Sequence, residues 1–134
     1  SSYGISSYFT INNKGYVLFG SNYFWEFDPV NLKWTRLANF PGPARGEPVS
    51  FVLDGLAYMG TGTSNATIFN DIWKYDPTAD SWTFVCSMPN PRTLGVAFTI
   101  NGKAYLGYGR YQYEDYKYFD LYDFYEFDPN YPMK

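Results

Sequence analysis

Short runs of alternating apolar and polar residues recur three times along the chain. The first run in each copy is SYFTI in residues 7–11, VSFVL in 49–53 and VAFTI in 96–100. Successive side chains of a β-strand point to opposite faces, so this period of two predicts a strand with one buried face. Phe9, Phe51 and Phe98 hold the same place in the three runs, and we expect them on the buried side.

A turn and a second strand follow each of these runs. The turn segments are NNK in 12–14, Asp54-Gly55 and Asn101-Gly102. Asp-Gly and Asn-Gly accept the positive φ angles that a two-residue hairpin turn requires. The second strands are GYVLFG in 15–20, AYMGTG in 57–62 and AYLGYG in 104–109. All three end on glycine, which indicates a backbone geometry or a close approach that a Cβ atom would prevent.

An Asp-Pro pair and a tryptophan mark the third and fourth strands. The third strands are FWEFDP in 24–29, IWKYDP in 72–77 and FYEFDP in 124–129. Their alternating aromatic and charged residues predict one buried and one solvated face, and Asp-Pro ends each strand in a turn. Trp34 and Trp82 open fourth strands in the first two copies. The sequence therefore predicts four-stranded antiparallel units in 1–40 and 41–88, and an incomplete unit in 89–134.

This order of features resembles the kelch repeat. The segments WEFDP, FPGPAR and GVAFTINGKAYLGYG in particular resemble kelch or galactose-oxidase-type propellers of bacterial secreted and surface proteins, although the first copy lacks a Pro-Arg lead-in. The resemblance implies an all-β fold of kelch-type β-propeller blades, about three units with the last lacking its fourth strand. It also implies an extracellular, periplasmic or bacterial cell-surface location, with the cytoplasm as the alternative.

Three units are too few for a closed propeller, which typically has about 4 to 8 blades. An open arc would expose the apolar sides of its end blades, and soluble proteins rarely leave such patches bare. We therefore expect further propeller blades, supplied by more of the same chain or by another chain. The alternative is an unusual small fold.

Composition and charge narrow the classes of function. Lys and Arg number 10 against 13 Asp and Glu, so the chain has no basic surface for nucleic acid. The sequence contains no His, which removes the commonest metal ligand and the usual proton-transfer group; we predict no cofactor, metal or catalytic residue. No apolar run approaches the roughly 20 residues of a spanning helix, so we do not expect a membrane span.

The connection between the second and third strands is unusually long in the third copy. It reads RYQYEDYKYFDLYD in 110–123, against SNY in 21–23 and TSNATIFND in 63–71. Long excursions of this kind bind something, cover something or are disordered. The binding candidates here are Arg110, Tyr111, Tyr113, Tyr116 and Tyr118. The alternative is that the rings pack on a neighbouring blade as an extended hairpin.

Two arginines, Arg45 and Arg92, hold equivalent places just before the first strands of the second and third copies. The kelch resemblance implies that they point toward the rim of the central channel, where a guanidinium group would bind a carboxylate through two hydrogen bonds. The alternative is that they donate to backbone carbonyls of the adjacent turn. Both arginines are binding candidates on the first interpretation only.

The sequence therefore favours a noncatalytic binding module that presents loops, notably the Tyr-rich 110–123, to a protein or glycan partner. One form of this hypothesis places the module within a cell-surface assembly. The alternative is a sugar-handling enzyme similar to sialate epimerases, with its site completed by missing blades. Fold alone does not separate these two functions, since one scaffold hosts both.

Overall fold

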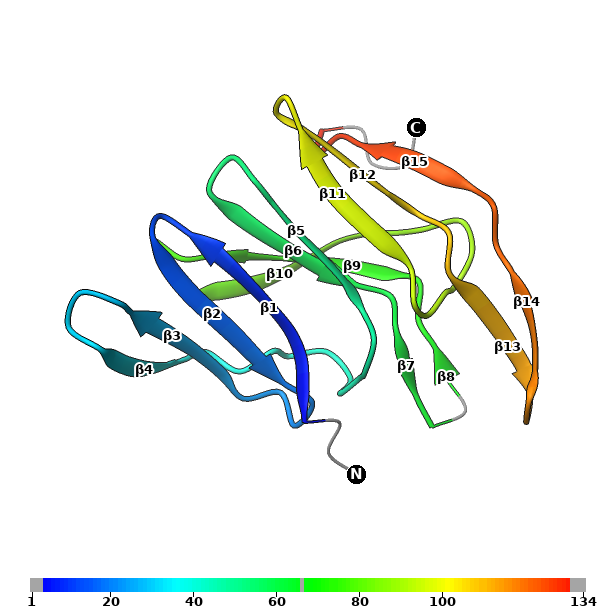
Figure 1. Cartoon of the computed structure of the whole chain (residues 1–134), viewed down its shortest axis with the longest axis horizontal. Helices are drawn as coiled ribbons and strands as arrows, with labels where there is room; N and C mark the ends of the chain where they lie inside the picture. The colour runs from blue at the N-terminus through cyan, green and yellow to red at the C-terminus, as the bar shows by residue number, and fades with distance from the viewer. Residues whose placement is uncertain (1–3, 66, 131–134) are drawn as a thin grey trace.

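The computed structural model describes residues 4–65 and 67–130, and these form antiparallel strands without any helix. The predicted all-β fold of stacked antiparallel units is confirmed. Three main sheets lie side by side, and two small hairpins extend from the same side of them (Figure 1). None of the described residues belongs to a helix that is long and apolar enough to cross a membrane.

The first two sheets have four strands each, in the order of the predicted units. The first contains β1 (Ile5–Ile11), β2 (Lys14–Phe19), β3 (Phe24–Asp28) and β4 (Lys33–Leu37). The second contains β5 (Val49–Leu53), β6 (Leu56–Gly60), β9 (Asp71–Asp76) and β10 (Ser81–Ser87). In both sheets each strand pairs with its neighbour in this order, so the unit is a simple antiparallel meander.

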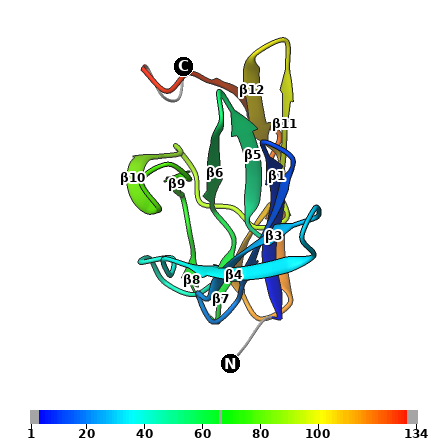
Figure 2. The ribbon, with the colours of Figure 1, turned by 90° about the vertical axis from the view of Figure 1, so that its left-hand side faces the viewer.

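The third sheet has three strands in the described part of the chain. They are β11 (Val96–Ile100), β12 (Lys103–Gly107) and β15 (Phe124–Phe127), and no described residue supplies a fourth. The first strands of the sheets, β1, β5 and β11, lie next to one another, with β10 on the opposite side of the molecule (Figure 2). This is the arrangement of propeller blades around an axis.

Hairpin turns join the first and second strands of all three sheets as predicted. Asn12 and Asn13 have φ angles of 50° and 64°, and the Asp54-Gly55 pair has 52° and 76°. Asn and Asp tolerate this left-handed region because their short polar side chains bond locally, and Gly has no Cβ to clash. The two-residue turns fix the register of the strand pairs on both sides.

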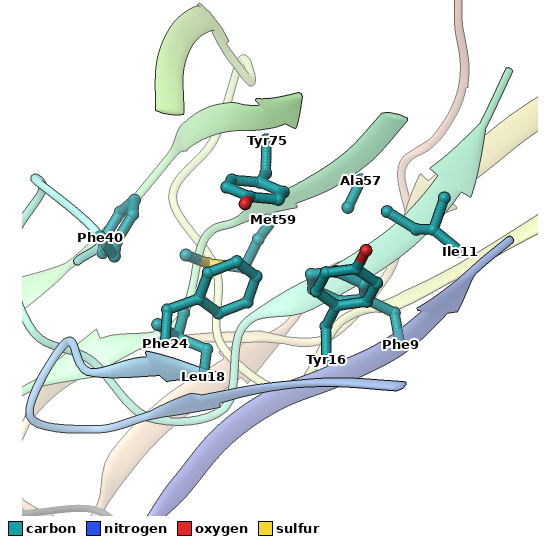
Figure 3. Close-up of a cluster of buried hydrophobic side chains, with 9 residues drawn as sticks. All are labelled: Phe9, Ile11, Tyr16, Leu18, Phe24, Phe40, Ala57, Met59 and Tyr75. Carbon is teal, nitrogen blue, oxygen red and sulfur yellow. The ribbon is translucent and has the colours of Figure 1, made fainter. Parts of the chain in front are cut away.

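The core lies between successive sheets. Apolar side chains of the first sheet pack against a face of the second, and Figure 3 shows Phe24 and Tyr16 beneath Tyr75 in this layer. The rings of Phe24 and Tyr75 meet edge to face with centroids 4.7 Å apart. The opposite face of the second sheet forms an equivalent layer with the third, where Phe127 meets Phe51 edge to face at 5.2 Å. Each sheet therefore has one face for the sheet before it and another for the sheet after it.

Candidate binding surface

The two small hairpins arise from the connections between second and third strands. One consists of β7 (Thr63–Ser64) and β8 (Thr67–Ile68), and the other of β13 (Arg110–Glu114) and β14 (Lys117–Asp120). The long Tyr-rich connection is therefore an extended hairpin. Thr93 and Arg110 exchange two backbone hydrogen bonds of 2.9 Å at its base, and Gly46 and Thr63 do the same at the shorter hairpin. The segment before the first strand of the second and of the third sheet, which contains Gly46 or Thr93 and is called the lead-in segment below, thus holds the hairpin of the same sheet.

Buried arginines anchor both hairpin bases. Arg92 donates two hydrogen bonds to the carboxylate of Asp123, at 2.8 and 2.6 Å, and others to the backbone oxygens of Tyr108 and Asn90. The Arg92 side chain is fully buried, whereas that of Asp123 keeps 23% of its surface exposed. The hydrogen bond from Arg92 holds the pKa of Asp123 far below its usual range, although partial burial opposes this shift.

Arg45 makes the same set of contacts one sheet earlier. Its guanidinium group bonds both oxygens of Asp71, one of them at 2.7 Å, together with the backbone oxygens of Thr61 and Pro43. Burial acts to raise the pKa of Asp71, but the hydrogen bonds and charge of Arg45 outweigh it, helped by the indole N–H of Trp73. Both carboxylates are therefore ionised, and each ion pair links the segment before a first strand to the start of the third strand of the same sheet. We call the pairs Arg45–Asp71 and Arg92–Asp123 the arginine clamps.

The sequence predicted Arg45 and Arg92 as candidate ligand-binding groups at a channel rim. The structure places both side chains inside the scaffold, where they bind backbone carbonyls and carboxylates of the same chain. Their partners Asp71 and Asp123 were missed. The available signal was their position, since each stands at the start of the third strand or directly before it in the two copies that have the Pro-Arg lead-in.

The β13–β14 hairpin has two differently built faces. On one face Phe119 lies between Tyr111 and Tyr113, with ring centroids 5.5 and 6.1 Å away. On the other face the guanidinium of Arg110 stacks over the ring of Tyr118, 3.8 Å from its centroid. Such a cation–π contact holds a long side chain flat and leaves the outer edge of the ring accessible. The hairpin therefore carries Tyr111 and Tyr113 on one face and Arg110 and Tyr118 on the other.

Tyr116 occupies the turn of this hairpin and has 98% of its surface exposed. Its φ angle is 61°, in the left-handed region that bulky residues seldom adopt. The turn joins Glu114 to Lys117, whose side chains form an exposed ion pair at 3.0 Å. The tip thus presents an aromatic ring that no other part of the described chain covers.

Shallow hollows flank the hairpin. The space between the two hairpins measures about 200 Å³ and is lined mainly by polar groups, including Thr63, Gln112, Glu114 and Asp115, with Tyr113 at its side. A second hollow of about 210 Å³ lies where Tyr111 and Phe119 approach Pro91 and Leu121. Among the described residues, no group of three or more Cys, Asp or Glu side chains is placed to hold a metal ion.

Comparison with known proteins relates the chain to a solved structure. No protein-family model matches it, and no curated protein matches it at a significant level. The chain is similar to the structure described as "Structure of YjhT", with 33% sequence identity and a TM-score of 0.69 over 77% of this chain. The match covers 33% of the YjhT chain, so the present chain spans about a third of that protein. Together with the stacked antiparallel sheets, this similarity shows a β-propeller-like fold.

Proposed function

We propose that the chain is a noncatalytic binding module built from kelch-type blades, with the β13–β14 hairpin as its binding element. The observation that carries this proposal is the contrast within the hairpin. Its base is held by a buried Arg92–Asp123 pair, whereas Tyr113, Tyr116 and Tyr118 are exposed beyond that base. Exposed aromatic rings on a braced support lose little entropy on binding.

A glycan is the ligand class that the surface fits best. Flat tyrosine rings can stack on the apolar face of a sugar, and the hydroxyl group of each ring can bond a sugar hydroxyl. The hollow beside Tyr113 adds the amide of Gln112 and the carboxylates of Glu114 and Asp115, which accept hydrogen bonds. Its volume of about 200 Å³ has room for a single sugar ring rather than a large ligand.

A protein partner is the second candidate, and the exposed tip favours it. Tyr is enriched at protein interfaces, and nearly the whole Tyr116 side chain is exposed and can be buried by a partner. A sugar-handling enzyme would need groups from further blades, since the buried arginines are already paired with carboxylates. A location outside the cytoplasm, which the kelch resemblance implies, remains a prediction.

A glycan array probed with the wild-type chain and with tyrosine variants tests the proposal. We expect Tyr113→Ala to weaken capture about tenfold, the loss of one good aromatic contact, and Tyr118→Ala, whose ring lies on the opposite face of the hairpin, to weaken it less. Tyr23→Ala is the matched control, because Arg36 stacks on the Tyr23 ring at 4.1 Å, as Arg110 does on Tyr118, but Tyr23 directly precedes β3 of the first sheet. If both hairpin variants capture glycan as well as the wild-type chain does, the hairpin is not the binding element. Capture of immobilised protein but no glycan would transfer the role to the second candidate.

A further inference from the structure

The two small hairpins extend from neighbouring sheets on the same side of the molecule (Figure 1). The β7–β8 hairpin arises from the second sheet, and the β13–β14 hairpin arises from the third. The hollow of about 200 Å³ between them is lined by Thr63, Asn65 and Ile68 of the first hairpin and by residues 112–115 of the second. A ligand in this hollow therefore contacts groups from two sheets.

One lead-in segment holds both hairpins at their bases. The backbone oxygen of Arg92 accepts a hydrogen bond of 2.8 Å from the amide of Gly62, and the Arg92 amide donates to the backbone oxygen of Phe69 at 3.1 Å. Gly62 and Phe69 flank the β7–β8 hairpin on its two sides. The next residue, Thr93, exchanges two hydrogen bonds of 2.9 Å with Arg110 at the start of β13. The segment thus runs between the two hairpins as a shared strand would.

Further contacts fix the position of this segment. The hydroxyl group of Thr93 donates to Oε2 of Glu47 at 2.9 Å, which ties the lead-in segment of the third sheet to that of the second. The guanidinium group of Arg45 lies 4.2 Å from the centroid of the Phe69 ring, next to the end of β8. The spacing of the two hairpin bases is therefore set by folding, and binding between the hairpins loses little free energy in ordering them.

The two walls of the hollow offer complementary groups. Ile68 contributes an aliphatic side chain from the β7–β8 wall, and Tyr113 contributes an aromatic ring from the β13 wall. The Thr63 hydroxyl already donates to the backbone oxygen of Thr67 at 3.1 Å, so its lone pairs are the groups left for a ligand. Together with the amide of Gln112, the hollow has apolar surface for a ring and hydrogen-bonding groups for its hydroxyls.

The charges that line the hollow are all negative. They belong to Glu114 and Asp115, and no described Lys or Arg lines the hollow. Glu114 pairs with Lys117 at 3.0 Å, whereas no ion pair or hydrogen bond within the described part of the chain holds the carboxylate of Asp115. An anionic ligand in this hollow meets a like charge at short range, which opposes binding.

We propose that the hollow is a two-walled subsite for one uncharged sugar ring, and that Asp115 and Glu114 exclude sugars that carry an anionic group. This inference rests on the proposed function, because it specifies which glycan the β13–β14 hairpin takes. It adds the β7–β8 hairpin as a second binding element. The first sheet has only the short connection 21–23, so the described repeat forms such a hollow only where two long connections are neighbours.

Immobilised glycans in matched pairs test the exclusion of anions. The members of a pair differ only in ending with glucose or glucuronic acid, and we expect the neutral member to be captured at least about tenfold more tightly. The double variant Glu114→Gln with Asp115→Asn should bring this ratio to within about threefold, because the repulsion is removed. Glu126→Gln is the control, since it removes a carboxylate that is also paired with a lysine but lies on β15, and it should keep the wild-type ratio. Raising the salt concentration to about 1 M should narrow the ratio in the wild-type chain, because the Debye length then falls to about 3 Å.

Ile68→Ala tests the second wall. We expect capture of the neutral glycans to weaken about fivefold, because an apolar contact with one side of the sugar is lost. Leu121→Ala is the matched control: Leu121 is also half-buried but lines the other hollow, and its variant should capture like the wild-type chain. Near-ultraviolet circular dichroism checks that the variants keep native packing.

The outcomes separate this inference from the proposed function. If Tyr113→Ala weakens capture but Ile68→Ala does not, the second wall is wrong while the hairpin remains the binding element. If both members of each pair are captured equally, the exclusion of anions is wrong while glycan binding stands. If no glycan is captured, or Tyr113→Ala captures like the wild-type chain, the proposed function fails and the subsite fails with it.

Discussion

The Arg92 clamp allows a sharp prediction about stability. Replacing Arg92 by Met keeps the long apolar stem but removes the guanidinium group. The side chain is fully buried and donates to both oxygens of Asp123 and to the backbone oxygens of Tyr108 and Asn90. In Arg92→Met these oxygens lose their donor, and the carboxylate is left charged beside an apolar side chain.

The expected cost follows from the burial of the pair. Removing one partner of a buried ion pair costs about 3–5 kcal/mol. Asp123 retains 23% exposure and also accepts hydrogen bonds from Asn90 and Tyr125, so water and neighbours recover part of this loss. We expect the free energy of unfolding to fall by about 3 kcal/mol, which corresponds to roughly 10 °C in Tm for a chain of this size.

Urea unfolding followed by tryptophan fluorescence and by far-ultraviolet circular dichroism measures this loss. All four tryptophans lie in the first two sheets, so agreement of the two probes shows that the third sheet unfolds with them. Arg36→Met is the control. Arg36 is exposed, stacks on Tyr23 and donates to Asn39, and we expect its loss to cost at most about 0.5 kcal/mol.

The double variant Arg92→Met with Asp123→Leu separates pairing from packing. Removing both charges leaves no unpaired carboxylate, so we expect the double variant to be more stable than Arg92→Met alone. A loss below about 1 kcal/mol in Arg92→Met would refute the clamp. A double variant less stable than Arg92→Met would show that the unpaired Asp123 carboxylate is not what destabilises Arg92→Met.

Three further predictions concern pH, glycine and the hairpin tip. The pKa of Asp123 is lowered in the folded chain, so its contribution to stability is complete above the unfolded value of 3.8 and is lost as pH falls below that value. The urea midpoint should therefore be constant from about pH 7 to 5 and then fall. The fall should be smaller in Asp123→Asn. Gly109 has φ 85° and its Cβ would meet the carbonyl oxygen of Thr93, so Gly109→Ala should lower the free energy of unfolding by roughly 2 kcal/mol in the same assay. Tyr116→Gly should raise it by up to about 1 kcal/mol, measured in parallel, because glycine adopts a φ of 61° without strain.

The sequence predicted the sheets well because their signals are local. A period of two predicted the strands around Phe9, Phe51 and Phe98, and Asp54-Gly55 and Asn101-Gly102 predicted the turns that follow the last two of them. The form of the 110–123 connection stayed open for the opposite reason. Its turn places Tyr116, rather than Gly or Asn, at the positive φ angle, so the usual turn signal is missing.

The arginine clamps show where local reasoning stops. Arg45 and Asp71 are 26 residues apart, and Arg92 and Asp123 are 31 apart, so only the folded sheet brings each pair together. A comparison of the copies carries some of this information. The first copy has Tyr23 where the others have Asp, and it also lacks the Pro-Arg lead-in. Arginine and aspartate thus occur together or not at all, as expected for partners.

Tyr116, at the tip of the β13–β14 hairpin, contributes little to folding. Arg92 and Asp123 hold the base, and nothing in the described chain covers Tyr116. A residue that is 98% exposed buries no apolar surface, and its left-handed φ costs free energy relative to glycine. Folding therefore gives no reason for tyrosine at this position. The binding role proposed for the hairpin supplies a reason, and on that proposal Tyr116→Gly should lose binding in the same variant that gains stability.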